Sequence, residues 1–160
     1  MVKVIREVKS RTTETNSIKS IKGDVLIPAS TTTTGIDLAN ATAILEDNIL
    51  LGGDINILRP KKSIDAIFMA HLLTHTKKFE IARKGQRITI IHVYGKDLAS
   101  LDVSIPSNLK EQQKIATVLT NADKEIELLG QQLADLQQEK KALMQVLLTG
   151  KKRVVVDGEG

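Results

Sequence analysis

Few residues of this sequence have the types and the spacing that catalysis requires. His71 and His75 stand four residues apart in HLLTH, and on a helix that spacing places two imidazoles where they can hold a metal ion. No acidic residue stands between them to act as a base, so a structural or surface role is favoured for both. The sequence has no cysteine, no G-x-x-x-x-G-K-[ST] phosphate loop and no G-x-G-x-x-G loop. We therefore expect no catalytic residue, no metal and no cofactor.

Basic and hydroxyl side chains are the better candidates for a binding site, and they suit a polyanion. The net charge of +4 lies in residues 1–106, because residues 107–160 carry eight basic and eight acidic side chains. Clustered cations attract phosphates, and hydroxyls bond phosphates or base edges. A polar loop without a ligand and ordinary solvated lysines are the alternatives. The candidates are Ser30, Thr31, Thr32, Thr33 and Thr34, and the basic Lys61, Lys62, Lys77, Lys78, Arg83, Lys84 and Arg87.

Residues 1–106 have the pattern of a small mixed domain. Apolar runs bounded by Gly, Asp or Pro predict strands at residues 25–27, 88–94 and 101–105, with Pro28 and Pro106 ending two of them and a turn at Gly95. Two more strands are predicted around turns at residues 46–48 and 52–53. Apolar residues at helical spacing predict a helix over 63–85, with Ser63 as its N-cap and Gly85 as its stop.

After Pro106 the sequence becomes a single long helix. Ser107 can cap a helix that runs to about residue 149, with Gly150 as its stop, a length of roughly 64 Å at 1.5 Å per residue. A domain of about 105 residues has a radius of gyration near 13 Å. The helix is therefore longer than its own domain can cover. The expected fold is α+β: a mixed domain over 1–106, a coiled-coil helix over 107–150 and a tail over 151–160.

One apolar seam follows this helix with alternating spacings of four and three residues. Such a heptad pattern indicates a coiled coil, and burial stabilises each of these side chains by about 1.5–3 kcal/mol. A single chain offers no second long helix, so we expect a homodimer through the seam. The predicted dimer-interface residues are Ile115, Leu119, Ala122, Ile126, Leu129, Leu133, Leu136, Leu143 and Leu147.

Lys140 occupies the remaining seam position and interrupts the apolar pattern. It either fixes the register of the pair or extends its apolar stem past a solvent-exposed end of the seam, and the second interpretation is the simpler. Beyond it, Ala142, Met144, Val146 and Leu148 make the helix apolar nearly all round, so we expect further contacts there.

Composition sets the remaining bounds. Apolar content is 41% and aromatic content only 2%, so a core must be built from Ile, Leu, Val and Ala. No apolar run approaches the roughly 20 residues that cross a bilayer, and the N-terminal MVKVIREVKSR lacks the apolar core of a secretory signal. With no cysteine, these features favour a cytoplasmic protein that does not contact a membrane.

The C-terminal third resembles the specificity subunit of bacterial type I restriction-modification enzymes. The resembling residues are a proline followed by Glu111-Gln112-Gln113-Lys114-Ile115-Ala116, and Lys140-Lys141-Ala142-Leu143-Met144-Gln145 followed by Leu147-Leu148-Thr149-Gly150-Lys151. The stretches KGDVLIP, LGGDINILRPKK and VYGKDLASLDVSIP are similar to pieces of the family's target recognition domain. The resemblance covers residues 22 to 154.

This resemblance implies a non-catalytic subunit that reads double-stranded DNA. Family members usually carry two recognition domains and two long helices that pair antiparallel, act as a ruler between two half-sites and dock the methyltransferase subunits. This chain has one of each, so it resembles half of a specificity subunit, and two copies would restore the usual arrangement. The segment KGQRITIIHVYG lies near DNA in the family, which adds His92 and Tyr94 to the candidate DNA-binding residues; a half-buried histidine is the simpler interpretation of His92 from its strand alone.

Two departures from the family pattern bear on DNA binding. The recognition domain is shorter than is common in the family by some 40–50 residues at its N-terminal side, and Arg87 stands where relatives tend to have a small residue. Arg87 is either a phosphate or guanine contact or a local variation. The alternative function is an interaction module that no longer reads DNA and only recruits, or competes for, methyltransferase subunits.

Overall fold

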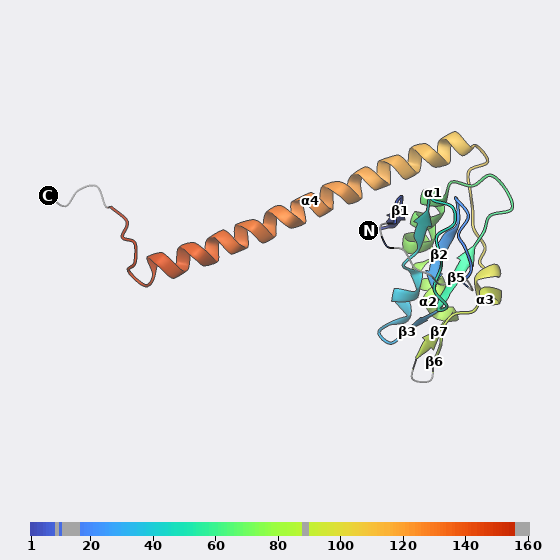
Figure 1. The fold of residues 1–160 in the computed structure, drawn as a ribbon, viewed down its shortest axis with the longest axis horizontal. Coiled ribbons are helices and arrows are strands. Elements are labelled where there is room, and N and C mark those ends of the chain that lie inside the picture. The colour runs from blue at the N-terminus through green and yellow to red at the C-terminus, as the bar shows by residue number, and fades with distance from the viewer. Residues whose placement is uncertain (9, 11–16, 88–89, 156–160) are drawn as a thin grey trace. The chain divides into compact units, whose positions relative to one another are not determined.

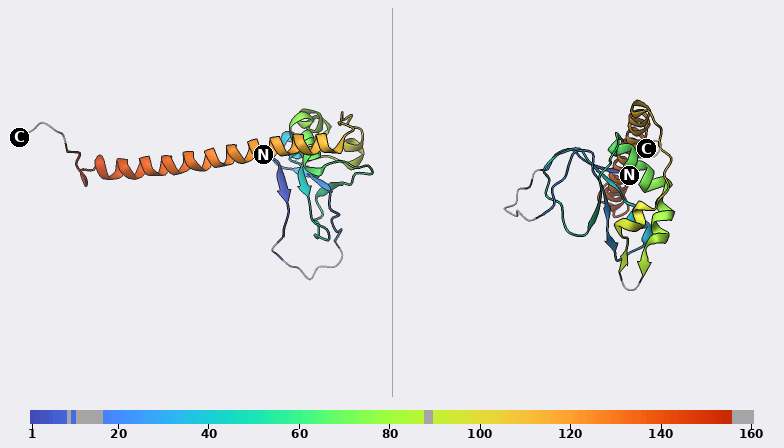
Figure 2. Two further views of the ribbon diagram at one scale, coloured as in Figure 1. Left: turned by 90° about the horizontal axis from the view of Figure 1, so that it is seen from above. Right: turned by 90° about the vertical axis from the view of Figure 1, so that its right-hand side faces the viewer.

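The computed structural model describes residues 1–8, 10, 17–87 and 90–155, with the backbone alone for residues 86 and 87. Two compact units divide the chain, Met1–Thr120 and Asn121–Gly160. The first unit is α+β, and a helix of 39 residues begins in it (Figures 1 and 2). The expected fold class is confirmed, whereas the domain boundary at residue 106 stays a prediction.

A mixed four-stranded sheet forms the centre of the first unit. Its strand order is β1 (Lys3–Ile5), β4 (Thr42–Ile44), β2 (Val25–Pro28) and β5 (Ile55–Leu58). The β1–β4 pair is parallel and the other pairs are antiparallel. Within β2, Val25 and Ile27 are fully buried while the alternate residues are half-buried, as expected when one face of a strand packs on helices.

Short helices cover that face of the sheet. They are the 3₁₀ helix η1 (Gly35–Ala39), α1 (Ala66–His71), the π-helical turn η2 (Leu72–Thr76) and α2 (Lys78–Lys84). α1 packs on β4 and β2, and η1 packs on α2 and β2. The core between the layers is aliphatic, as the composition predicts, and its buried members are Val25, Ile27, Leu38, Ala39, Ala41, Ala43, Ala66, Met69, Ala70, Leu73, Ile81, Val93 and Leu98.

The helix predicted over 63–85 is divided into three parts. Its N-cap is Asp65 rather than Ser63, because the Asp65 carboxylate accepts a hydrogen bond from the Phe68 backbone N–H at 2.8 Å. The Lys77 N–H donates to the Leu72 carbonyl at 3.0 Å, five residues back, which closes a wide π turn between α1 and α2. Gly85 ends α2, as predicted.

Two predicted strands also take another form. Residues 88–94 do not make one strand: β6 (Gln86–Arg87) and β7 (Ile91–His92) are antiparallel partners, so the chain turns back between them, and residues 88 and 89 lie outside the described part. The expected turn at Gly95 is the first residue of α3 (Gly95–Ala99). Residues 101–105 join no strand ladder in the described chain, and their apolar Leu101 and Ile105 instead pack against the core.

The long helix α4 (Leu109–Leu147) is close to its predicted length. It begins two residues late because Asn108, not Ser107, accepts at its first turn: the Asn108 side chain accepts from the Lys110 N–H at 2.9 Å. Gly150 follows its end with φ +72°, a left-handed conformation that favours glycine, and donates to the Leu147 carbonyl. At 1.5 Å per residue the helix is about 58 Å long.

An ion pair between the buried Asp24 and the half-exposed Arg59 fixes the turn before β2. Asp24, 1% exposed, accepts two hydrogen bonds of 2.8 Å from the Arg59 guanidinium and one from the Ile21 N–H. Burial alone would raise the pKa of Asp24, but these hydrogen bonds and the Arg59 charge outweigh it and lower the pKa below its usual 3.8. The folded pKa is thus below the unfolded one, so this stabilisation is complete above about pH 4 and is lost as the pH falls through the folded pKa.

Arg59→Gln should therefore destabilise the first unit by about 1–3 kcal/mol at pH 7, because it leaves Asp24 buried with one strong partner fewer. This expected destabilisation is smaller than that for breaking a fully buried ion pair, because Arg59 itself is half-exposed. The loss should shrink as the pH falls below about 4, where Asp24 of the unfolded chain begins to protonate. Urea unfolding at pH 7 and pH 3.5 measures both values. Lys77→Gln, which breaks the half-buried pair Lys77–Glu80 within one helical turn, is the comparison and should change stability less than Arg59→Gln does, because neither of its partners is fully buried.

Candidate nucleic-acid interface

The threonine-rich segment belongs to a second, smaller sheet. β3 (Ser30–Thr31) pairs antiparallel with β7, with Ser30 opposite His92 and Thr31 opposite Ile91, and β6 pairs with the other side of β7. In Figure 1 this sheet lies at the end of the unit away from α1. Segments that are about 60 residues apart in the sequence are thus brought together, and Arg87 lies on β6 beside them, although its side chain lies outside the described part.

The hydroxyl groups of this segment are already donating hydrogen bonds. Thr33 and Thr34 donate to one carboxylate oxygen of Asp37 at 2.6 and 2.7 Å, and the Thr34 N–H donates to the same oxygen at 3.1 Å. These hydrogen bonds lower the pKa of Asp37, so the carboxylate is ionised at neutral pH. Ser30 donates to Asp54. Ser30, Thr33 and Thr34 therefore offer lone pairs and negative charge to a ligand rather than free O–H donors, which disfavours a phosphate as their direct partner, whereas the exposed Thr32 can still donate.

A groove runs beside this segment and contains one of the candidate cations. Thr34 and Ile91 line it, together with the exposed Phe79 and Arg83 of α2. Two glycines let the elements approach so closely: a Cβ at Gly35 would lie 3.0 Å from the Ala82 carbonyl oxygen, and one at Gly85 would lie 2.6 Å from an Ile91 methyl carbon. An exposed aromatic ring, a guanidinium and the Thr34 hydroxyl, whose hydrogen is donated to Asp37, thus line one groove.

A second group of side chains follows β7. The rings of His92 and Tyr94 are nearly parallel, with centroids 6.3 Å apart, and the Lys96 ammonium lies 5.8 Å from the Tyr94 ring centroid. His92 is half-buried and Tyr94 is exposed. Both predicted residues therefore lie next to the small sheet, together with a lysine that sequence reasoning did not single out.

Most of the other basic candidates lie away from both the groove and the His92–Tyr94 group. Lys61 and Lys62 follow the end of β5 that pairs with Val25, whereas the opposite end of β5 lies beside Ser30. Lys77 is paired with Glu80 at 2.8 Å, and the Lys84 ammonium donates to the Ser100 hydroxyl at 2.6 Å. The seven basic candidates are thus divided among several surfaces. Arg83 lines the groove with Thr34, and Lys78 lies close enough to Asp37 for its charge to help lower the pKa of that carboxyl.

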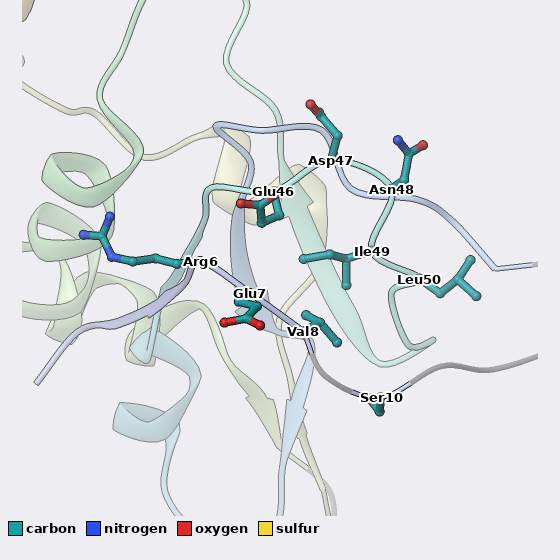
Figure 3. A pocket seen from close by; sticks show the side chains of 9 residues that line it. All are labelled: Arg6, Glu7, Val8, Ser10, Glu46, Asp47, Asn48, Ile49 and Leu50. Carbon is teal, nitrogen blue, oxygen red and sulfur yellow. The ribbon is translucent and has the colours of Figure 1, made fainter.

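A separate hollow lies beside the end of β1 (Figure 3). Its lining carries three carboxylates and a single cation, so it has no attraction for a phosphate, and none of the predicted site residues lies in it. The lining residues are Arg6, Glu7, Val8, Ser10, Glu46, Asp47, Asn48, Ile49 and Leu50. Among the described residues, no group of three or more His, Asp or Glu could hold a metal ion.

The first turns of α4 are fixed within the first unit by a stripe of small and polar residues. Gln112 and Ala116 are buried, and Thr120, one turn further, lies 3.4 Å from Nε2 of the buried His71. His71 also stacks on His75, with ring centroids 5.8 Å apart. The seam is a different face of the helix, about 100° away from this stripe. Ile115 is half-buried and Leu119 is 39% exposed.

In the second unit the seam is open along its whole length. Leu129, Leu133 and Leu136 are 56–62% exposed, and the other seam residues from Ala122 to Leu147 are exposed as well. A row of exposed leucines on one helix face is unfavourable in water, so this face is suited to an interface. No helix in the described part of the chain is long and apolar enough to span a membrane.

Comparison with known proteins identifies the family. The model of the type I restriction modification DNA specificity domain matches residues 4–138. The chain belongs to this family. The specificity-domain fold also appears in two solved structures. One comes from work on complex assembly and conformational transition of the type I R-M system, with 23% identity and a TM-score of 0.62 over 80% of this chain. The other is a type I restriction-modification S subunit from M. genitalium, with 18% identity and a TM-score of 0.55 over 91% of this chain.

These two likenesses concern the fold. The specificity-domain chain spans about a third of the length of each, 30% of the first and 37% of the second. The architecture expected from the resemblance, a small mixed sheet-and-helix domain followed by a long helix, is confirmed. The individual DNA-binding and dimer residues stay predictions.

Three residues with clear roles in this specificity domain were not predicted. Asp37 organises the threonine segment, and its signal was present in the sequence, since Thr34-x-x-Asp37 has the spacing of a capping box. Gln112 accepts from the Asp65 N–H at 2.9 Å and donates to the Pro106 carbonyl at 2.7 Å. No local pattern indicates that role, because its partners are 47 and six residues away. Phe79 lies in the groove, and its exposure is a property of the folded packing.

Proposed function

We propose that this chain is a non-catalytic specificity subunit of a type I restriction-modification system, acting on double-stranded DNA in the cytoplasm. Its recognition domain, residues 1–106, reads DNA, and its helix pairs with a second copy and docks methyltransferase subunits. Membership of the specificity-domain family over residues 4–138 is the observation that carries the proposal. The groove beside the small sheet supports the first part, and the exposed leucine seam supports the second.

The chemistry of the groove suggests how DNA is read. Thr34 in the groove, with Thr33 and Asp37 beside it, presents acceptors, and in the major groove of DNA the matching donors are the amino groups of adenine and cytosine. Arg83 suits guanine or a phosphate, and the exposed ring of Phe79 suits a thymine methyl group. We therefore assign the threonine segment to base edges and Arg83 to guanine or the DNA backbone. The sequence left open whether the hydroxyls bind phosphates or base edges, and this assignment selects the base edges.

A two-fold dimer would read the same half-site twice in inverted orientation, because symmetric proteins bind sites whose symmetry matches their own. The methyltransferase subunits would cover apolar side chains of α4 that lie outside the seam. Leu128 is 59% exposed and Leu148 is 78% exposed, and neither can contact a helix that occupies the seam.

DNA binding by the full chain should depend steeply on salt. We expect the logarithm of the affinity for random duplex DNA to fall linearly with the logarithm of the salt concentration, as counterions are released. Arg83→Ala should lower the affinity about tenfold at 50 mM salt and reduce that slope by about one if Arg83 contacts a phosphate. Fluorescence anisotropy over a salt series measures both. Adding the methyltransferase subunit should give a larger DNA complex on a native gel.

Lys110→Ala is the matched control, because Lys110 is an exposed cation at the start of α4 and far in sequence from the groove. Its affinity and slope should stay close to those of the unchanged protein. Binding that is undetectable, or independent of salt, would reject DNA reading by this chain, and a methyltransferase complex that forms without DNA would then leave only the docking role.

A further inference from the structure

The seam of α4 is symmetric in its spacing about residue 131. Its intervals of four and three residues are the same when read from either end, so a second copy running in the opposite direction, centred on residue 131, matches every seam position with a seam position. The facing pairs are Ile115 with Leu147, Leu119 with Leu143, Ala122 with Lys140, Ile126 with Leu136, and Leu129 with Leu133.

This arrangement places the longest seam side chain opposite the smallest. Lys140 faces Ala122, so the four-carbon stem of the lysine fills the space that a methyl group leaves. In a parallel pair each residue would face its own copy, which sets two ammonium groups against each other at Lys140 and leaves a gap between two alanines at Ala122. Size and charge therefore both favour the antiparallel pair.

Two acidic residues beside the seam share one flank in this register. In the centred antiparallel pair, Glu125 of one copy lies on the same flank as Glu139 of the other, where two like charges alone would repel. In such a pair Lys140, with its stem across Ala122, would bring a positive charge next to this flank and offset the repulsion of Glu125 and Glu139. All three side chains are exposed in the single chain, so a second copy can engage them.

Registers shifted by one heptad lose this match. A shift in one direction leaves Ile115 and Leu119 without a facing residue and sets Lys140 against Leu129. A shift in the other direction leaves Leu143 and Leu147 unpaired and sets Lys140 against Ile115. Both would bury a lysine stem against a large apolar residue and expose leucines, so neither is as favourable as the centred register.

We propose that Lys140 and Ala122 set the register of an antiparallel pair of α4 helices from two copies of this chain, centred on residue 131. The proposal rests on the proposed function, in which the helices hold the two half-sites at a fixed distance. One heptad is about 10 Å along a helix, and base pairs are about 3.4 Å apart, so a slip of one heptad would change that distance by about three base pairs. The pair thus determines which half-site spacing is accepted.

Disulfide trapping tests the register directly, because the sequence has no cysteine to interfere. Leu119→Cys and Leu143→Cys proteins, mixed in equal amounts and oxidised, should form a 119–143 linked dimer, and neither should link to itself. Self-linking of each variant would show a parallel pair, and linking of Leu119→Cys to a Leu136→Cys variant would show a shifted register. Either result overturns the proposal while leaving the dimer in place. Sedimentation of the reduced proteins separates the two failures, since monomers would overturn the two-copy arrangement itself.

A charge exchange tests the role of Lys140. Lys140→Glu should weaken dimerisation at least about tenfold, and adding Glu125→Lys should restore it, because the exchanged charges again face each other across the pair. Within one helix these two residues are 15 positions, or about 22 Å, apart, so the rescue can only act between copies. Lys141→Glu, on the neighbouring lysine outside the seam, is the control and should have little effect. A double variant as weak as Lys140→Glu alone, or a rescue no larger than the gain that Glu125→Lys gives in the unchanged protein, would overturn the assignment.

Discussion

Replacing Leu129 and Leu133 together by glutamate should convert the protein into monomers at micromolar concentration. The two leucines are 56% and 57% exposed in the single chain and face each other across the proposed two-fold axis. Each buried leucine contributes about 1.5–3 kcal/mol, so the four side chains of a dimer account for roughly 6–12 kcal/mol. A micromolar dimer has a binding free energy of only about 8 kcal/mol. Sedimentation velocity of the full chain gives the measurement.

Leu128→Glu is the matched control for that double variant. Leu128 has nearly the same exposure, 59%, and adjoins Leu129, but it points away from the seam. It should leave the dimer intact, and circular dichroism should show equal helix content in all three proteins. If the double variant still sediments as a dimer, the seam has been assigned to the wrong face of α4.

The long helix could be predicted from the sequence because each of its signals is local. A four-three apolar repeat, a proline before it and a glycine after it specify the element, and its observed ends differ by two residues at each side. The broken helix between residues 63 and 85 could not be predicted in the same way. Its π turn depends on a single hydrogen bond from Lys77 to Leu72, and the apolar spacing is compatible with either form.

The alternation of apolar residues in 101–105 predicted a strand, but in the structure this segment packs on the core without pairing to a described strand. Leu101, Val103 and Ile105 alternate as in a strand and are half-buried, yet Leu101 and Ile105 pack against the core and the segment joins no described ladder. The alternation reports which side chains are covered. It does not report whether the backbone groups find a neighbouring strand, which depends on segments distant in the sequence.

The candidate site was predictable in its parts but not in its arrangement. The threonines, Arg83, His92 and Tyr94 were selected by residue type, and the small sheet places them on neighbouring elements. Lys61 and Lys62 were grouped with Arg83 because they are near in sequence. In the structure they follow the end of β5 that pairs with Val25, whereas the threonine segment follows Pro28 at the opposite end of β5. Whether the threonine hydroxyls are free to donate to a ligand depends on Asp37. Only the three-dimensional structure shows that the hydroxyls of Thr33 and Thr34 both donate to the same carboxylate oxygen of Asp37.

Gln112→Ala should be among the most damaging single substitutions in the first unit, although glutamine in a helix is usually replaceable. Gln112 is 2% exposed, and its amide joins three elements: it accepts from the N–H of Asp65, the cap of α1, and donates to the carbonyl of Pro106, just before α4. Alanine leaves both backbone groups without this partner in a partly buried place, at a cost of about 1–3 kcal/mol each. We expect a total loss of about 2–4 kcal/mol, measured by urea unfolding.

Gln113→Ala isolates this effect, because Gln113 is the next residue, is exposed, and has the same intrinsic helix propensity. It should change the unfolding free energy by less than about 0.5 kcal/mol. The two neighbouring glutamines in the family motif thus have separate roles, since one clamps the start of α4 to α1 and the other faces solvent. Equal stability of the two variants would mean that Ala116 and the α1 contacts fix the helix without the clamp, and that the recognition domain is joined to its helix by apolar packing alone.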